Sequence, residues 1–571
     1  MKKLTRREML KLAALSSTGA VLAACGGAAS PTAAPTTAAV QAPAATEATT
    51  AQATATVAAA AAVTDTVAPT AAPTAGAPIK ITFIDSWFGV PQYADSITPV
   101  TTALSKKAQS EGVNVEFSSM ILDDHPNKYP AMYASGADFS AAFDAPWYKM
   151  NTLRDQKALV ALETLVDSDG PKLKEEITDK IYTFNFDTGP DGQRHLYGIP
   201  TAFYYGGTTG VVLREDLRKQ FNLPAPDPAK GWSSFEPFLE GIAKNVKGMT
   251  PFANTASYSP VSVAHASQGY YTWSPIAEAD LFFILKTFDK SEFKLVESET
   301  DKGFIDRAKM VRSWWEKGWM NKADLPLSGA TETVEKDFLF PGKAASDQNN
   351  DAEVKAWQEF NTPMKQANPD AELKGYDLTG LSTGQWKGLG ALKQWNFIVF
   401  NASSPKEKQQ AAVQWWNWLA SSTDNIDMWL MGIEGTNWKK EDNNRFSEVA
   451  GVDASTNYRR QWYVSGISGR FQRLAVDIIP EAEKIIKANA AEANWVFNPY
   501  EGFSVDRKPI ESELTKIAAI ATEAHHALYT GQLTADAGLA KITKMFDEAG
   551  RQKVKEEVQK QFDAYVASFK G

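Results

Sequence analysis

Alternating apolar and polar positions mark the start of the folded part of the chain. Residues 79–84 alternate with β-branched side chains and predict a strand, and residues 94–110 have the spacing of an amphipathic helix. The strand pattern returns at residues 113–117 and 139–143, with a helix expected over about 128–135 between them. This order predicts a parallel sheet covered by helices, in which ligands bind outside the carboxyl ends of the strands.

The pattern continues with shorter elements. Aromatic alternation over residues 182–186, an Asp-Gly turn and residues 195–197 predict a hairpin. Residues 209–213 predict another buried strand. A later helix is expected to begin at one of two serines, Ser233 or Ser234, because a hydroxyl at this position can cap the first free N–H groups.

The segment ahead of the first strand has a different composition. Residues 26–78 are almost wholly Ala, Thr, Pro, Gly and Val, and Glu47 and Asp65 are their only charges. Such a stretch cannot bury enough apolar surface to offset chain entropy, so residues 25–78 are predicted to be a disordered tether. Nearly 500 residues of ordinary globular composition follow, a length that predicts two domains or more.

The first 24 residues have the layout of an export signal. A basic start precedes an apolar run over residues 12–24, which is too short to span a bilayer as a helix. Cys25, the one cysteine of the chain, ends a Leu-Ala-Ala-Cys sequence that resembles the bacterial lipobox, which implies lipidation of Cys25. The Arg6-Arg7 pair resembles a twin-arginine signal, and the general secretory route stays open as the alternative.

Charge and motifs narrow the function classes. The net charge is −9 and no basic patch stands out, so no nucleic acid partner is expected. The chain has no His-Glu-x-x-His, Gly-x-Ser-x-Gly or phosphate-loop motif. His525 and His526 are adjacent on a predicted helix and would point in different directions. We therefore expect no catalytic residues, no cofactor and no metal.

Aromatic residues supply the candidate chemistry. The chain has 17 Trp, 17 Tyr and 29 Phe, and flat aromatic faces pack well against the C–H faces of sugar rings. Six tryptophans in helical patterns are expected in the core: Trp314, Trp315, Trp319, Trp415, Trp416 and Trp418. Aromatic residues in loops or at strand ends are the ligand candidates: Trp87, Trp147, Tyr204, Tyr205, Trp273, Trp386, Trp395 and Trp438. Polar neighbours that could bind hydroxyls are Asp85, Asp144, Asp347, Gln348 and Asn396.

Several motifs occur in a recognisable order. They include Asp-Ala-Pro-Trp at 144–147, Tyr-Gly-Ile-Pro at 197–200, Trp-Ser-Ser-Phe-Glu at 232–236, Phe-Pro-Gly-Lys-Ala-Ala at 340–345 and Gly-Ile-Glu-Gly-Thr-Asn-Trp at 432–438. Together with the lipobox, they resemble the extracellular solute-binding lipoproteins of ABC importers, in the large sugar-binding branch. The resemblance covers most of residues 79–450.

The resemblance implies an α/β, two-lobed, periplasmic-binding-protein-like (type II) fold, with lobes joined by crossing hinge strands. Residues 79–200 would form the first part of lobe 1 and residues 201–394 lobe 2. Residues 395–571 would return to lobe 1 and add C-terminal helices that could contribute to lobe 2. The crossings are expected at residues 197–200 and 396–400.

The function implied is that of a membrane-anchored, extracytoplasmic binding protein. It would capture a carbohydrate, in the first place an oligosaccharide, in the cleft between the lobes and deliver it as a monomer to ABC permease subunits. A peptide or polyol ligand, or a lipid-anchored glycan hydrolase, are the alternatives. Related alginate- and oligosaccharide-binding proteins carry an acidic calcium loop that Lys244–Thr250 lacks, so no calcium is predicted there.

Overall fold

The computed structural model describes residues 76–86, 94–201, 205–253, 259–261, 271–276, 279, 281–285, 295–321, 334–379, 387–453, 456–460 and 473–568. Thr74–Gly571 forms one compact unit. Within the described part, no helix combines the length and the apolar character needed to cross a membrane. Cys25 and the predicted tether up to residue 75 lie outside the described residues.

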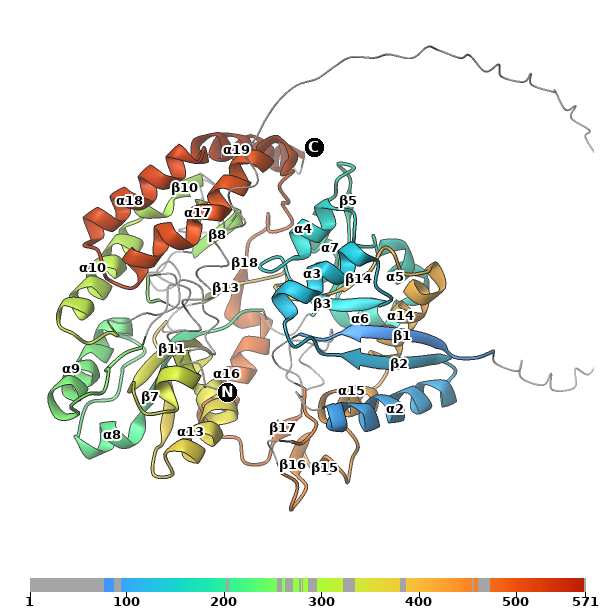
Figure 1. Ribbon diagram of the computed structural model, residues 1–571, viewed down its shortest axis with the longest axis horizontal. Coiled ribbons are helices and arrows are strands. Elements are labelled where there is room, and N and C mark those ends of the chain that lie inside the picture. The colour runs from blue at the N-terminus through green and yellow to red at the C-terminus, as the bar shows by residue number, and fades with distance from the viewer. Residues whose placement is uncertain are drawn as a thin grey trace, which may run out of the picture. The chain divides into compact units, whose positions relative to one another are not determined.

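A five-stranded sheet in the order β2-β1-β3-β14-β6 forms the centre of the first lobe (Figure 1). Its strands are β1 (Ile79–Ile84), β2 (Val115–Met120), β3 (Ala141–Asp144), β6 (Gly198–Pro200) and β14 (Phe397–Phe400). β1 pairs in parallel with β2 and β3, as the sequence predicts. β14 runs antiparallel to β3 and β6, so the complete sheet is mixed rather than parallel.

Helices cover both faces of this sheet. They are α2 (Ala94–Ser110), α3 (His125–Ser135), α4 (Met150–Asp155), α5 (Glu163–Asp169), α6 (Pro171–Ile177), α7 (Asp179–Phe184), α14 (Lys406–Leu419) and α15 (Thr423–Met431). Ile81 and Phe83 share a core with α2, α14 and α15, whereas Ile84 packs on the other face with α3 and α4. The period-two alternation of β1 thus fills two cores, one on each side of the sheet.

The second lobe contains two antiparallel sheets, β11-β7-β12 and β10-β9-β8. Their strands are β7 (Thr209–Arg214), β8 (Tyr271–Ile276), β9 (Leu281–Leu285), β10 (Leu295–Glu297), β11 (Ser346–Asn350) and β12 (Leu373–Asp377). Helices α8 (Glu215–Gln220), α9 (Glu236–Asn245), α10 (Lys302–Glu316), α12 (Ala352–Lys355) and α13 (Asn361–Ala367) belong to the same part of the chain.

Three C-terminal helices complete the core of the second lobe. They are α17 (Glu511–Tyr529), α18 (Ala535–Glu548) and α19 (Arg551–Ser568), drawn in red in Figure 1. Leu514 and Phe562 lie in one hydrophobic core with Trp232 and Trp314, which come from far earlier in the sequence. The rings of Phe562 and Phe283 are 4.4 Å apart between centroids. The chain end therefore stabilises the second lobe.

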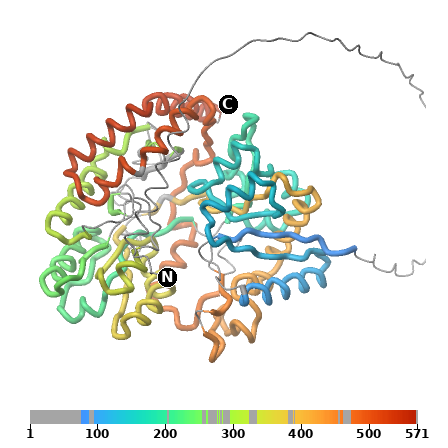
Figure 2. The backbone as a smooth tube through the Cα atoms, in the orientation of Figure 1, coloured from blue at the N-terminus to red at the C-terminus, as the bar shows by residue number. Residues whose placement is uncertain are grey.

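Three stretches of chain run together where the lobes join (Figure 2). β13 (Gly388–Gly390) pairs in parallel with β18 (Trp495–Phe497). The amide of Tyr205 donates to the carbonyl of Asn489 at 3.3 Å, and the amide of Ala391 donates to the carbonyl of Tyr205 at 2.5 Å. The strands expected at the crossings, β6 and β14, lie side by side in the first sheet, and the chain leaves or enters that sheet at their ends.

A smaller sheet and one further helix lie between α15 and α17 in the sequence. The strands are β15 (Trp438–Glu441), β16 (Arg445–Glu448) and β17 (Leu474–Ala475), and the helix is α16 (Pro480–Ala490). α16 shares a small apolar cluster with Val354 of α12. This segment therefore links the region after α15 to the second lobe.

Two local predictions were wrong. Residues 182–184 end helix α7 rather than forming a strand, because Ile181 and Tyr182 fill the core of the first lobe. The hairpin is reduced to β4 (Asp187–Thr188) and β5 (Arg194–His195). Neither predicted serine caps α9: both lie in the 3₁₀ turn η1 (Gly231–Phe235), where the Ser234 hydroxyl instead donates to the carbonyl of Gly231 at 2.6 Å.

Candidate functional site

The pairing of β3 with β14 brings two distant tryptophan segments to one edge of the first sheet. Phe397, the first residue of β14, is in register with Asp144, the last residue of β3. Because the strands are antiparallel, the segment that carries Trp147 just beyond β3 runs beside the segment that carries Trp395 and Asn396 just before β14. This edge is the carboxyl end of β1, β2 and β3, where the sequence predicts ligand contacts.

These tryptophans differ from the other aromatic residues in exposure. Trp147 and Trp395 are each 54% exposed, and within the described residues they are the only exposed large aromatic side chains. The Trp147 indole N–H donates to the Asn396 side-chain oxygen at 3.1 Å. The Asn396 carbonyl accepts from the Thr201 amide and hydroxyl at 3.0 and 3.1 Å. We call Trp147, Trp395 and Asn396 the tryptophan platform.

The two strand-end aspartates lie beneath this edge and make internal contacts. Asp85, after β1, is fully buried and paired with the equally buried Arg460, at 2.5 and 3.0 Å between nitrogen and oxygen atoms. Asp144 is also fully buried and accepts from the Tyr129 hydroxyl at 2.8 Å. Burial raises the pKa of Asp144 to about 6. Both carboxyl groups therefore support the edge from inside.

A histidine that the sequence analysis did not select lies in the same layer. His125, at the start of α3, is 1% exposed, and its Nδ1 is 3.1 Å from the Tyr148 hydroxyl oxygen. Burial lowers the pKa of His125 to about 4, so the ring is neutral near pH 7. Its signal in the sequence is its place in the short loop after β2, directly after two acidic residues.

The second-lobe candidates lie on β11 and are buried. Asp347 is 1% exposed, and burial together with the neighbouring Glu335 carboxyl raises its pKa well above the ordinary value. Gln348 is 2% exposed, and neither its side-chain oxygen nor its nitrogen has a hydrogen-bond partner within the described residues. A buried amide without a partner is costly, so Gln348 is suited to bind a water molecule or a ligand group.

The remaining candidates fall into different surroundings. The Tyr205 hydroxyl donates to Glu492 at 3.4 Å at the junction of the lobes. Trp438 is 4% exposed and donates to the Gly432 carbonyl at 2.9 Å, so protein encloses its ring. The backbone of Trp273 lies in β8, but its side chain lies outside the described residues, as do Trp87, Tyr204 and Trp386.

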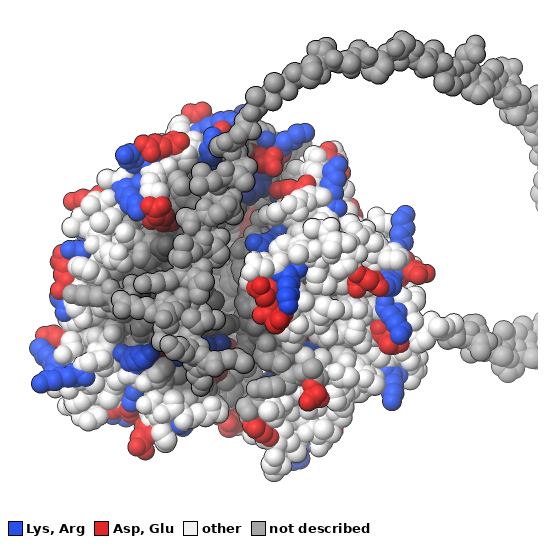
Figure 3. All heavy atoms as spheres, viewed as in Figure 1, with Lys and Arg blue, Asp and Glu red and all other residues white. Residues whose placement is uncertain are grey.

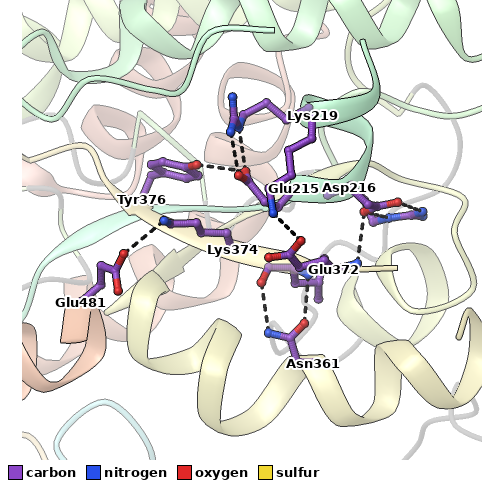
Figure 4. A network of polar contacts seen from close by, with 11 residues as sticks. Glu215, Asp216, Lys219, Asn361, Glu372, Lys374, Tyr376 and Glu481 are labelled. Atoms are coloured by element: carbon purple, nitrogen blue, oxygen red, sulfur yellow. Dashed lines mark hydrogen bonds and ion pairs between the residues drawn. The ribbon is translucent and has the colours of Figure 1, made fainter. Parts of the chain in front are cut away.

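Another polar cluster lies in the second lobe (Figure 4). Glu215 accepts from Arg218 at 2.7 Å and from the Tyr376 hydroxyl at 3.0 Å. Lys219 donates to Glu372 at 2.6 Å. These charges are paired with one another across α8 and β12, so the cluster stabilises the lobe and offers little to a ligand.

A cavity within the described residues lies away from the tryptophan platform. A hollow of about 360 Å³ lies between the β4–β5 hairpin and α19. Its polar groups bind each other: Gln561 exchanges two hydrogen bonds with the backbone of Asp506, and Arg194 donates to the carbonyls of Phe186 and Gly502. The hollow is thus a seam between packed segments, and the tryptophan platform stays the candidate site.

Neither surface charge on the face in Figure 3 nor a metal-binding group marks a further site within the described residues. On the face shown in Figure 3, acidic and basic side chains are interspersed rather than gathered into one basic area. Within the described residues, no group of three or more His, Cys, Asp or Glu side chains is placed to hold a metal ion. The chemistry of the edge is that of indole rings and amides.

Comparison with known proteins identifies the fold. Residues 499–567 match a family described as a domain of unknown function, DUF3502. No curated protein matches the sequence significantly. The N-glycan transport solute binding protein NgtS of Streptococcus pneumoniae has a similar structure, with a TM-score of 0.63 and 18% identity over 86% of this chain and 99% of that chain.

Two other solved structures are similar. The alginate-binding protein AlgQ2 without calcium ion gives a TM-score of 0.57 and 16% identity, over 85% of this chain and 98% of that chain. The substrate binding protein FusA of S. pneumoniae, in complex with kestose, gives a TM-score of 0.55 and 13% identity, over 86% of this chain and 100% of that chain. The chain therefore has the two-lobed α/β fold of solute-binding proteins.

Proposed function

We propose that this protein is an extracytoplasmic binding protein that captures an oligosaccharide between its lobes and delivers it to the permease of an ABC transporter. The observation that carries the proposal is the tryptophan platform at the carboxyl edge of the first sheet: two half-exposed indoles and an amide that binds the Trp147 indole N–H. The similar structures, whose names refer to N-glycan, alginate and kestose, support a carbohydrate ligand.

The physical basis is the match between an indole face and a sugar. The C–H face of a pyranose covers an indole ring, while its hydroxyl groups remain at the rim for polar partners such as Asn396. Covering the exposed half of one indole removes on the order of 100 Å² from water, worth about 2–3 kcal/mol. Trp147 and Trp395 together offer an extended ligand two such places.

Binding is tested with the full chain against a glycan panel, read by thermal shift and intrinsic fluorescence. Trp147→Ala and Trp395→Ala should each weaken glycan binding by roughly 10- to 100-fold, from the burial energy above. Trp315→Phe, on α10 of the second lobe, is the matched control and should leave the affinity unchanged. Stabilisation by peptides or polyols but by no glycan would contradict the proposal, and turnover of a labelled glycan would indicate a hydrolase.

Anchoring and domain organisation are part of the same proposal. We propose that the export signal is removed and that Cys25 is lipidated, which keeps the monomeric receptor beside its permease; Cys25→Ser should then release it from the membrane fraction. For the domains, we propose that residues 79–200 and the first part of the segment from 395 form lobe 1, and that residues 201–394 form lobe 2 together with the C-terminal helices. The core shared with α17–α19 supports assigning the C-terminal helices to lobe 2.

A further inference from the structure

A single buried carboxyl group closes the turn that carries Trp147. One oxygen of Asp144 accepts from the amide of Ala145 at 2.7 Å and from the amide of Lys149 at 3.0 Å. These amides lie on opposite sides of Trp147 in the sequence. The other oxygen accepts from the Tyr129 hydroxyl at 2.8 Å. The turn is therefore held at both ends by one side chain, which is itself fixed by α3.

An aromatic layer supports the turn from below. Tyr129 is fully buried and its ring stacks on His125, with centroids 4.8 Å apart. The Tyr148 hydroxyl is 3.1 Å from the Nδ1 of His125, so the residue next to Trp147 is also tied to α3. The direction of the turn is thus set by two separate contacts to the same helix.

The Trp147 ring is only partly enclosed by the described residues. It is 54% exposed, and it contacts Phe143 and Tyr148 with centroid separations of 6.4 and 5.9 Å. Its hydrogen bond to Asn396 fixes one edge of the indole. Because half of the ring lies in water, the backbone of the turn, which the Asp144 carboxyl group closes, contributes to its orientation.

The chemistry of Asp144 differs from that of the other strand-end aspartate. Asp85 has a guanidinium partner, whereas the hydrogen bonds to Asp144 come from backbone N–H groups and a phenol. A desolvated carboxyl group without a cation is costly to keep. A carboxylate can accept several hydrogen bonds at once, and the turn uses this: Asp144 accepts from two amides and one hydroxyl.

We propose that Asp144 and Tyr129 are positioning residues of the carbohydrate site, which hold Trp147 in the orientation that stacks on a sugar ring. This inference rests on the proposed function and deepens it. Neither side chain needs to touch the ligand: Asp144 acts through the turn, and Tyr129 acts through Asp144.

Three substitutions separate positioning from mere stability. Asp144→Ala removes every acceptor, and glycan affinity should fall by roughly 10- to 100-fold. Asp144→Asn keeps one oxygen for the two amides, and its NH₂ can donate to the Tyr129 oxygen, so affinity should return to within about threefold of the wild type. Tyr129→Phe removes one hydrogen bond and should cost about three- to tenfold.

The direct readout is the Trp147 ring itself. The full chain is labelled with 5-fluorotryptophan, and the Trp147 resonance in the fluorine spectrum is assigned from Trp147→Phe. In Asp144→Ala this resonance should shift or broaden while that of Trp438 stays in place. Val166→Ala, a fully buried change in the core on the other face of the sheet, should lower the melting temperature without moving the Trp147 resonance or the affinity.

The outcomes separate the two proposals. If the wild type binds no glycan, the proposed function fails. If the wild type binds a glycan and both Tyr129→Phe and Asp144→Ala bind it equally well with an unchanged Trp147 resonance, the positioning role is overturned. Should Asp144→Ala not fold, the Tyr129→Phe and Asp144→Asn variants decide by the same two readouts.

Discussion

The buried pair of Asp85 and Arg460 is the most consequential electrostatic contact at the carboxyl edge of the first sheet. Both side chains are 0% exposed, and Arg460 donates to both Asp85 oxygens. It also donates to the Tyr458 hydroxyl at 2.7 Å, and its guanidinium lies 3.9 Å from the centroid of the Trp429 ring. The pair therefore joins a segment near residue 460 to the end of β1.

The substitution Arg460→Met keeps the apolar stem of the side chain and removes its charge. It leaves the Asp85 carboxyl buried without its cation, and breaking a buried pair in this way costs about 3–5 kcal/mol of unfolding free energy. Asp85→Asn should cost a similar amount. In the double variant no buried charge remains, so its loss should be smaller than the sum of the two by a few kcal/mol.

Urea unfolding followed by fluorescence measures the total loss, and amide hydrogen exchange on β1 and β2 shows whether the loss lies in the first lobe. The adjacent Arg459→Met is the control, because Arg459 pairs at 2.8 Å with the half-exposed Glu448 and such surface pairs contribute about 0–1 kcal/mol. A loss below about 1 kcal/mol for Arg460→Met, or strict additivity in the double variant, would refute the reasoning.

Two further predictions concern the second lobe and the junction. Burial and the nearby Asp377 raise the pKa of Glu353 from the ordinary 4.5 to about 7, so its contribution to stability declines as the pH rises through that window. At pH 8 the free energy of unfolding of Glu353→Gln should therefore be about 2–3 kcal/mol higher than that of the wild type, and near pH 4.5 the difference should vanish. Urea titrations at both pH values measure it. In Gly388→Ala, the new Cβ would lie 2.1 Å from Cζ3 of Trp495, so the variant should lose about 1–3 kcal/mol in the same titration; an unchanged midpoint would contradict this packing.

Much of the first lobe could be predicted because its signals are local. The strand over Ile79–Ile84 and the helix over Ala94–Ser110 have the predicted bounds, since a clear alternation is followed by a clear amphipathic repeat. Five of the six tryptophans expected in the core are less than 10% exposed, and Trp315 is half-buried. Helical spacing was enough to assign these rings.

The antiparallel entry of β14 could not be predicted from local pattern. Its partners β3 and β6 lie some two hundred residues or more before it, and a short apolar run carries no sign of strand direction. The hairpin at 182–186 failed for a related reason: five residues with three aromatic side chains fit a helix end as well as a strand. Packing against the core decided the outcome.

The candidate site was predicted in part. The half-exposed Trp147 and Trp395 lie where the strand-end argument expected aromatic residues, although their contact with a ligand stays a prediction. Asp85 and Asp144 lie at the ends of strands in the same way, but their surroundings come from Arg460 and Tyr129. Nothing next to either aspartate in the sequence distinguishes an acid that faces outward from one that supports the edge from within.

The inward direction of the two aspartates bears on the class of ligand. Asp85 is neutralised by Arg460, and Asp144 is enclosed by neutral donors, so neither carboxyl presents its charge at the tryptophan platform. What the platform itself offers is two indole faces and one amide. A peptide terminus or a charged side chain would gain little from such a surface, because burying an ion requires an opposite charge. A neutral sugar presents C–H faces and hydroxyl groups, and its transfer out of water costs far less free energy than that of an ion. The support of the edge by buried acids thus favours a neutral oligosaccharide over a peptide.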